Sequence, residues 1–157
     1  MSTGRRVMIA IDGSQVSDMA FEFYKEEIQK STDYVVLIYV TDVPQNIMES
    51  DFYHQYDLSE LGKKYANCCE TVRARREDLE IKLKEMSVEG RIEIIYSKNP
   101  GAALEKYSSE NHITLIIVGN RGLGKVTRAI FGSVSSHLLH NSNVPILVVP
   151  KKSKDIN

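Results

Sequence analysis

The chain has 157 residues, of which 42% are hydrophobic and 26% are charged, as expected for one globular domain. A net charge of −1 disfavours proteins that hold nucleic acid or an anionic membrane through a basic patch. The apolar runs are shorter than the ~20 residues that span a bilayer, and no signal-peptide-like run precedes the first of them. We therefore expect a single cytosolic domain over 1–157, with flexible ends at 1–4 and 151–157.

Strand-like and helix-like segments alternate along the chain. Short apolar runs rich in β-branched residues predict strands, and apolar residues at helical spacing predict helices. In chain order, we expect strands at 5–11, 33–40, 91–96, 113–118 and 145–150, and helices at 16–28, 58–86, from 99 onward and at 133–142. Strands that are apolar throughout and alternate with helices indicate an open parallel sheet with helices on both faces.

Local signals indicate where helices begin and which surfaces are exposed. Asp12, Ser14 or Ser17 could cap the first helix, and Asn99–Pro100 predicts a cap followed by proline in the first turn. Charged residues of the long helix indicate a solvated surface rather than a binding patch. These are Arg73, Arg75, Arg76, Glu77 and Asp78.

Cysteine and histidine do not predict a metal or redox centre. Cys68 and Cys69 are adjacent, which matches no metal or redox spacing, and we interpret them as small apolar residues. His137 and His140 could share a helix face, but the sequence indicates no third ligand. We therefore expect no metal site made of protein side chains.

In parallel sheets of this kind, ligands bind beyond the carboxyl ends of the strands. That rule selects Asp12 after the first strand, Val40–Thr41 after the second and Gly119 onward after the fourth. The loop at 41–57, with Pro44 and several aromatic residues, is expected near the same edge. It could cover a ligand or bind a partner, and the sequence favours neither.

The stretch GNRGLGKVT at 119–127 nearly matches a phosphate-binding P-loop. The P-loop motif needs Ser or Thr directly after its Gly-Lys pair, to bind Mg²⁺, and Val126 stands there instead. A P-loop would also leave Gly132–Ser133, just before the last helix, without a role. We therefore prefer an anion site divided between a turn and a helix start.

In the divided site, Gly119 and Gly122 flank a tight turn after the fourth strand, and Gly132–Ser133 opens the last helix. Backbone N–H groups at a helix start carry partial positive charge, which suits phosphate oxygens. The donors would be the N–H groups of Ser133, Val134 and Ser135 and two of their hydroxyls, with Arg121, Lys125 and Arg128 nearby. Turn residues and a solvated loop are the alternative explanation of the same glycines and cations.

The spacing Gly119-x2-Gly122-x9-Gly132–Ser133 resembles the ATP-binding signature of the universal stress protein family. VMIAIDGS resembles the first strand and acidic turn of the family, and VGNRGLGKVTRAIFGSVSSHLLHNSNVPILVV resembles its C-terminal block. The resemblance covers nearly the whole chain. It implies an open five-stranded parallel sheet of order 3-2-1-4-5, a Rossmann-like fold.

The resemblance also implies a site for ATP or AMP, with Mg²⁺ as an optional companion of the nucleotide. Asp12 would contact the nucleoside beside the backbone of Ala10 and Ile11, Val40 would read the adenine edge through its backbone, and Gly119 would lie against the ribose. Around the phosphates would lie Arg121, Gly122, Gly132, Ser133, Val134 and Ser135. Members of the family often dimerise through the last strand, here 145–150, an edge otherwise left unpaired.

Three classes of function remain open from the sequence. The preferred one is a nucleotide-binding stress-response module. Because no water-activating base is evident, it would at most hydrolyse ATP slowly or phosphorylate itself on Ser133 or Ser135. The second is an ATPase or adenylylating transferase on the related fold, although this chain has DGSQ where such transferases carry an HIGH-type motif. The third is a partner-binding member without nucleotide, which typically lacks the glycine signature.

Overall fold

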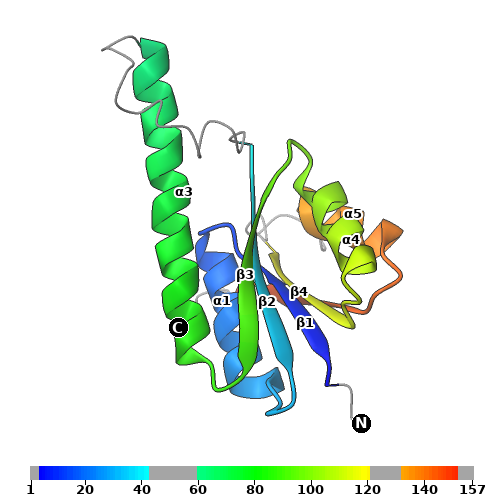
Figure 1. Cartoon of the computed structure of the whole chain (residues 1–157). Helices are drawn as coiled ribbons and strands as arrows, with labels where there is room; N and C mark the ends of the chain where they lie inside the picture. Colours follow the sequence, from blue (N-terminus) through cyan, green and yellow to red (C-terminus); the bar gives the residue numbers. More distant parts are fainter. Residues whose placement is uncertain (1–3, 43–59, 121–131, 152–157) are drawn as a thin grey trace, which may run out of the picture.

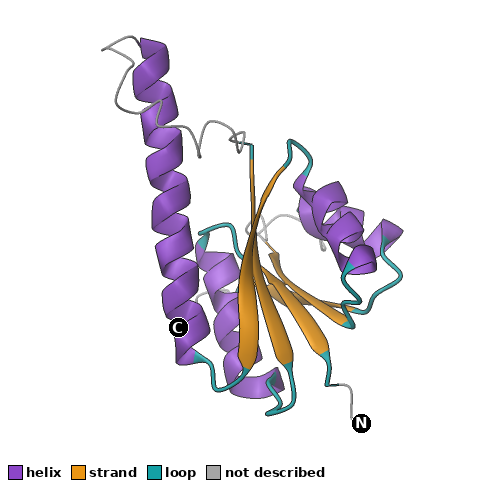
Figure 2. Cartoon of the chain, in the orientation of Figure 1, coloured by secondary structure: helices purple, strands orange, loops and turns teal. Residues whose placement is uncertain are grey.

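The computed structural model describes residues 4–42, 60–120 and 132–151. They form a five-stranded sheet of order β3-β2-β1-β4-β5 with helices around it (Figures 1 and 2). The strands are β1 (Arg6–Ala10), β2 (Tyr34–Thr41), β3 (Glu89–Tyr96), β4 (Leu115–Asn120) and β5 (Ile146–Pro150). The helices are α1 (Gln15–Phe23), which continues as the π-helical turn η1 (Tyr24–Ile28), α3 (Glu60–Glu85), α4 (Pro100–Glu110) and α5 (Ser133–Asn141). All four strand pairs are parallel, so the predicted fold and strand order are confirmed.

Helices cover both faces of the sheet, α1 and α3 on one side and α4 and α5 on the other (Figure 1). Phe21 and Leu79 belong to the apolar cluster under α1 and α3, and Leu104 and Leu138 to the cluster under α4 and α5. Each of these four side chains is at most 2% exposed. Burying one such side chain contributes about 1.5–3 kcal/mol, so the two clusters hold the helices against the sheet.

The central strand explains why the apolar runs lack alternation. β1 pairs with β2 on one side and with β4 on the other. Val7, Met8 and Ile9 are all 0% exposed, although successive side chains point to opposite faces. A strand that is covered on both faces therefore needs apolar residues at every position.

Several predicted strand boundaries move by one or two residues in the structure. β3 begins at Glu89 rather than at 91, because its first residues still pair with β2. β4 begins at Leu115 rather than at 113, because the Ile113 N–H donates to the carbonyl of Ser108 at the end of α4. β4 then continues to Asn120, which places the first glycine of the predicted turn inside the strand.

The helix starts follow the capping chemistry expected from the sequence. Of the three candidates for α1, Ser14 is the cap: its hydroxyl accepts the N–H of Ser17 at 3.2 Å. Asp12 instead accepts the N–H of Ser14 at 2.9 Å. For α4, the predicted cap is confirmed, because the side chain of Asn99 accepts the N–H of Ala102 at 3.1 Å and proline follows.

A buried carboxylate ties the amino ends of the first two strands together. The side chain of Asp33 is 0% exposed and receives the Arg5 guanidinium at 2.7 Å, the Tyr24 hydroxyl at 2.8 Å and the Lys30 N–H at 2.9 Å. Burial alone would raise the pKa of Asp33, but these hydrogen bonds and the charge of Arg5 outweigh it and the pKa is lowered. Burial and the hydrogen bond to Asp33 raise the pKa of Tyr24.

Within the described ranges, no helix combines the length and apolar character needed to cross a bilayer.

Candidate nucleotide-binding site

A cavity of about 140 Å³ opens where β1, β2 and β4 end. Pro100 and Leu104 of α4 form part of its wall, a contribution that the sequence analysis missed because no local pattern brings α4 to this edge. A cavity of about 150 Å³ holds one aromatic ring, whereas whole ligands occupy about 300 Å³ or more. The described residues therefore enclose room for a ring-sized group. The predicted site residues that line it are Ala10, Ile11, Asp12, Val40, Gly119 and Val134.

The polar rim of the cavity is the turn after β1. Asp12 is exposed, and its carboxylate is oriented by the hydrogen bond from the Ser14 N–H. Gly13 has a φ of +82°, a left-handed conformation that residues with a side chain adopt only with strain. Ser14 and Ser17 also line the cavity. The turn thus presents a carboxylate and hydroxyl groups beside an otherwise apolar wall.

The start of α5 lies beside this wall, since Val134 belongs to both. Gly132 occupies the cap position and provides no side-chain hydrogen bond to the helix. The first intrahelical bond runs from the Ser136 N–H to the Gly132 carbonyl, which leaves the N–H groups of the preceding turn without intrahelical acceptors. Ser133 is exposed, whereas Ser135 is 2% exposed and donates its hydroxyl to the Gly132 carbonyl. Only one of the two predicted hydroxyl donors is therefore accessible.

The glycines of the predicted divided site differ in their surroundings. Gly119 is the last residue but one of β4, and the turn that it was predicted to flank lies outside the described residues. A Cβ there would come within 2.5 Å of the Val16 carbonyl oxygen, so Gly119 lets α1 pack closely on β4. Among the described residues, the nearest atom to a Cβ added at Gly132 would be the Ser135 Oγ at 3.8 Å, and φ is −60°. Packing and conformation therefore both tolerate a side chain at Gly132.

One positioning residue was assigned no role from the sequence. Asn120, the last residue of β4, is 8% exposed, and its Oδ1 accepts the Gly132 N–H at 3.1 Å. This bond holds the end of β4 beside the start of α5. A buried polar residue at the end of an apolar strand is the signal that could have identified it. Four further predicted site residues lie outside the described residues: Arg121, Gly122, Lys125 and Arg128.

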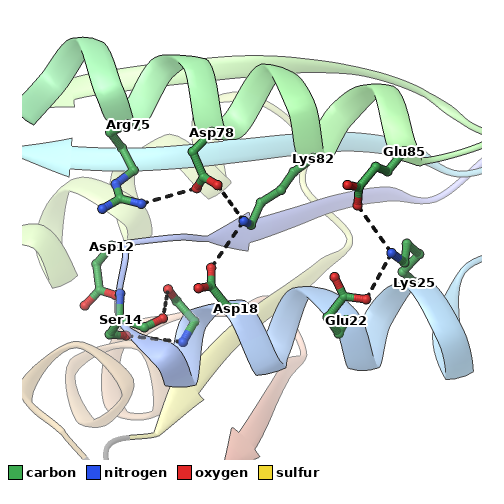
Figure 3. Close-up of polar contacts among 10 residues, drawn as sticks. Asp12, Ser14, Asp18, Glu22, Lys25, Arg75, Asp78, Lys82 and Glu85 are labelled. Atoms are coloured by element: carbon green, nitrogen blue, oxygen red, sulfur yellow. Dashed lines mark hydrogen bonds and ion pairs between the residues drawn. The ribbon is translucent and has the colours of Figure 1, made fainter.

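The charge cluster on α3 is not uniformly solvated, which corrects the sequence interpretation (Figure 3). Arg75 and Asp78 face α1, and an ion-pair chain continues through Lys82 to Asp18. Arg73, Arg76 and Glu77 are exposed, as predicted. The sequence interpretation failed because helical spacing alone does not distinguish a face toward solvent from one toward a neighbouring polar helix.

Among the described His, Cys, Asp and Glu side chains, no group of three could hold a metal ion. His140 Nδ1 lies 2.7 Å from the Ser136 carbonyl oxygen, and the His137 side chain packs beside Gly101 of α4. Cys69 is buried in a small cluster with Val72, as expected for a small apolar residue, and burial raises the pKa of its thiol.

Comparison with known proteins points to one family. The model of the universal stress protein family matches residues 4–150. A putative universal stress protein of Staphylococcus haemolyticus is 28% identical over 152 residues, which cover 95% of this chain and 86% of that protein. The universal stress protein MJ0577 of Methanocaldococcus jannaschii is 26% identical over 129 residues, 82% of this chain and 73% of that protein.

Solved structures share the fold at low sequence identity. The structure of MJ0577 has a TM-score of 0.70 at 20% identity, covering 97% of this chain and 99% of that one. A universal stress protein family protein from Arabidopsis thaliana with AMP bound has a TM-score of 0.69 at 17% identity, covering 98% and 95%. A universal stress protein in complex with cAMP has a TM-score of 0.60 at 19% identity, covering 94% and 98%. With the family model matching nearly its whole length, this chain belongs to the universal stress protein family.

Proposed function

We propose that the protein binds an adenine nucleotide at the carboxyl edge of the sheet and acts as a stress-response module whose state depends on nucleotide occupancy. One observation carries the proposal: a ring-sized apolar cavity, an oriented carboxylate at Asp12 and an uncapped helix start at Gly132 meet at one sheet edge. The base requires an apolar cavity, the ribose a hydrogen-bond acceptor and the phosphate a set of N–H donors. Relatives solved with AMP and with cAMP support the same ligand class.

The adenine fits the apolar part of the cavity. Ala10, Val40 and Val118 form part of its wall. In this proposal, backbone groups where β1 and β2 end would pair with the polar edge of the base. The carboxylate of Asp12 is an acceptor for ribose hydroxyls. Selectivity for adenine over guanine would come from the backbone donor and acceptor at Val40, since the two bases present different edges.

The phosphates fit the start of α5. Without a side-chain cap, the N–H groups of Ser133 and Val134 remain donors for an anion, and the helix dipole favours negative charge there. A cap residue with an oxygen would stabilise α5 better than glycine does. The choice of Gly132 is therefore explained by the approach of a ligand and not by folding. Mg²⁺, when present, would be held by the phosphates.

Binding, rather than efficient turnover, is the activity that we assign. Asp12 lies at the nucleoside end of the proposed site, away from the phosphates at α5, so it does not serve as a base at the γ-phosphate. If self-phosphorylation occurs, Ser133 is the acceptor, because the hydroxyl of Ser135 is buried and already donates to Gly132.

The last strand is the proposed dimer contact. β5 is an edge strand, and its residues Ile146, Leu147 and Val148 are apolar and half-buried. Edge strands without charged residues tend to pair with another strand, and a second copy of β5 would supply one. Light scattering coupled to gel filtration should give about twice the 17.8 kDa of one chain, and a monomer at micromolar concentration would contradict this part of the proposal.

Calorimetric titration of nucleotide-stripped protein with ATP, AMP, cAMP, GTP and adenosine tests the proposed ligand. We expect binding of adenine nucleotides and weaker binding of GTP. Asp12→Asn keeps an acceptor for the Ser14 N–H but removes the charge, so affinity should fall about tenfold. Lys25→Met, whose ion pairs lie far along α1 and α3 from the cavity, is the matched control and should bind as the wild type does. Absence of binding to every adenine compound would remove the proposal.

A further inference from the structure

A side chain from α3 packs directly against the rim of the proposed nucleotide site. The guanidinium of Arg75 lies so close to Gly13 that a Cβ on this glycine would sit 1.6 Å from Nη2 and 2.1 Å from Cζ. Figure 3 shows Arg75 reaching from α3 toward the turn that carries Asp12 and Ser14. Gly13 thus combines a left-handed backbone conformation with direct contact to Arg75, whose guanidinium an added Cβ would displace.

Arg75 is itself held in place from two sides. Its Nη1 donates to Asp78 at 3.2 Å, Asp78 accepts from Lys82 at 2.8 Å, and Lys82 also pairs with Asp18 of α1 at 3.4 Å. The guanidinium also lies 5.8 Å from the centre of the Tyr39 ring. These contacts hold the guanidinium in place against Gly13.

The position of Arg75 is not the one that ion pairing alone would select. Its Nε is buried and has no hydrogen-bond partner within the described parts of the chain. Leaving a buried donor unpaired is unfavourable. The guanidinium therefore lies against Gly13 although its Nε has no hydrogen-bond partner among the described residues, and the contact with the turn is the feature that distinguishes Arg75.

We propose that Arg75 is a positioning residue for nucleotide binding: by packing behind Gly13 it holds the Asp12–Ser14 turn in the conformation that lines the cavity. The inference rests on the proposed function. Asp12 touches the ligand and Arg75 does not, so α3 contributes to affinity through the turn. The ion-pair chain also links α3 to α1 beside the turn.

A plain interhelical ion pair is the competing explanation, and the molecule contains a matched example. Lys25 of η1, the continuation of α1, pairs with Glu22 at 2.9 Å and with Glu85 of α3 at 3.4 Å, at the end of the helix interface that lies away from the turn (Figure 3). If Arg75 only joins α3 to α1, replacing Arg75 or Lys25 by methionine should have the same kind of effect. If Arg75 positions the turn, only its replacement should alter the turn.

The test compares Arg75→Met with Lys25→Met, each shown to be folded by circular dichroism. Hydrogen exchange of the Ser14 amide, which donates to Asp12, is measured by NMR without ligand, and AMP affinity is measured by calorimetry. In Arg75→Met we expect exchange of the Ser14 amide to be about tenfold faster. AMP binding should be about tenfold weaker, because the carboxylate of Asp12 is no longer held in the orientation in which it accepts a hydrogen bond from the nucleotide. Lys25→Met should leave both unchanged.

Equal behaviour of the two variants in Ser14 exchange would overturn the inference. If Arg75→Met does not fold, Arg75→Lys replaces it: lysine keeps the charge but not the flat guanidinium, so a smaller shift in the same direction is expected. Wild-type protein that binds no adenine nucleotide would remove the proposed function. The exchange of Ser14 would then decide the role of Arg75 by itself.

Discussion

Replacing Gly132 by serine should separate binding from folding at the start of α5. In the part of the chain that the structure describes, a Cβ at Gly132 would meet nothing closer than the Ser135 Oγ at 3.8 Å, and φ of −60° suits residues that carry a side chain. A serine at a cap position accepts an N–H of the first helical turn, which stabilises a helix by about 0.3 kcal/mol relative to glycine. For a chain of this size, that corresponds to a rise in Tm of about 1 °C.

The same substitution should weaken the binding of phosphate-bearing ligands. The new hydroxyl would accept the N–H that a phosphate oxygen needs, and a hydrogen bond to a charged group is worth about 1.5–3 kcal/mol. We therefore expect Gly132→Ser to lower ATP affinity about 10- to 150-fold while adenosine binds as before. Calorimetry gives the affinities for ATP and adenosine, and a thermal melt gives the Tm. Unchanged ATP affinity in a protein with an unchanged or higher Tm would refute the placement of phosphate at α5.

Gly119→Ala is the informative contrast. An added Cβ would lie 2.5 Å from the Val16 carbonyl oxygen, so backbone must move. Overpacking of this kind costs about 1–3 kcal/mol. We expect Gly119→Ala to be destabilised before any ligand is added, whereas Gly132→Ser is not, although both glycines belong to the same sequence signature. Similar stability of the two variants would contradict the assigned packing.

Three further predictions address the hydrogen bond between Asn120 and Gly132, the buried carboxylate of Asp33 and covalent modification. Asn120→Asp keeps the acceptor for the Gly132 N–H but adds negative charge at the start of α5. ATP affinity should therefore fall, whereas adenosine affinity should not. A parallel loss of both affinities would contradict the role assigned to the hydrogen bond between Asn120 and Gly132. Folding lowers the pKa of Asp33, so the ionised carboxylate stabilises the protein fully above its unfolded pKa of about 3.9. This stabilisation is lost as the pH falls below that value. Urea titrations should therefore show a flatter decline in the free energy of unfolding between about pH 5 and 2 for Asp33→Asn than for the wild type. If intact-mass analysis after incubation with Mg-ATP finds a phosphate adduct, Ser133→Ala should abolish it and Ser135→Ala should not, and the reverse pattern would refute the assignment by burial.

The sequence by itself was sufficient for the layers of the fold. Uniformly apolar runs such as 33–40 occur where both faces of a strand are covered, and helical spacing of apolar residues marks segments that cover them. The rule that ligands bind beyond the carboxyl ends of parallel strands also selected Asp12 and Val40, and both line the cavity. The strand order came from the family resemblance and not from these patterns, because periodicity carries no information about which strands are neighbours.

Only the tertiary structure decided what individual residues do at the site. Gly119 and Gly132 belong to the same sequence signature, yet Gly119 packs against α1, whereas an added Cβ at Gly132 would only touch Ser135 among the described residues. Arg75 has the spacing of an exposed helix residue, and its contact with Gly13 joins positions far apart in the chain. Local patterns report burial and periodicity, which neighbouring residues share. The contacts that give these side chains their roles arise when distant segments meet, and their physical cause lies in the packed arrangement of the elements.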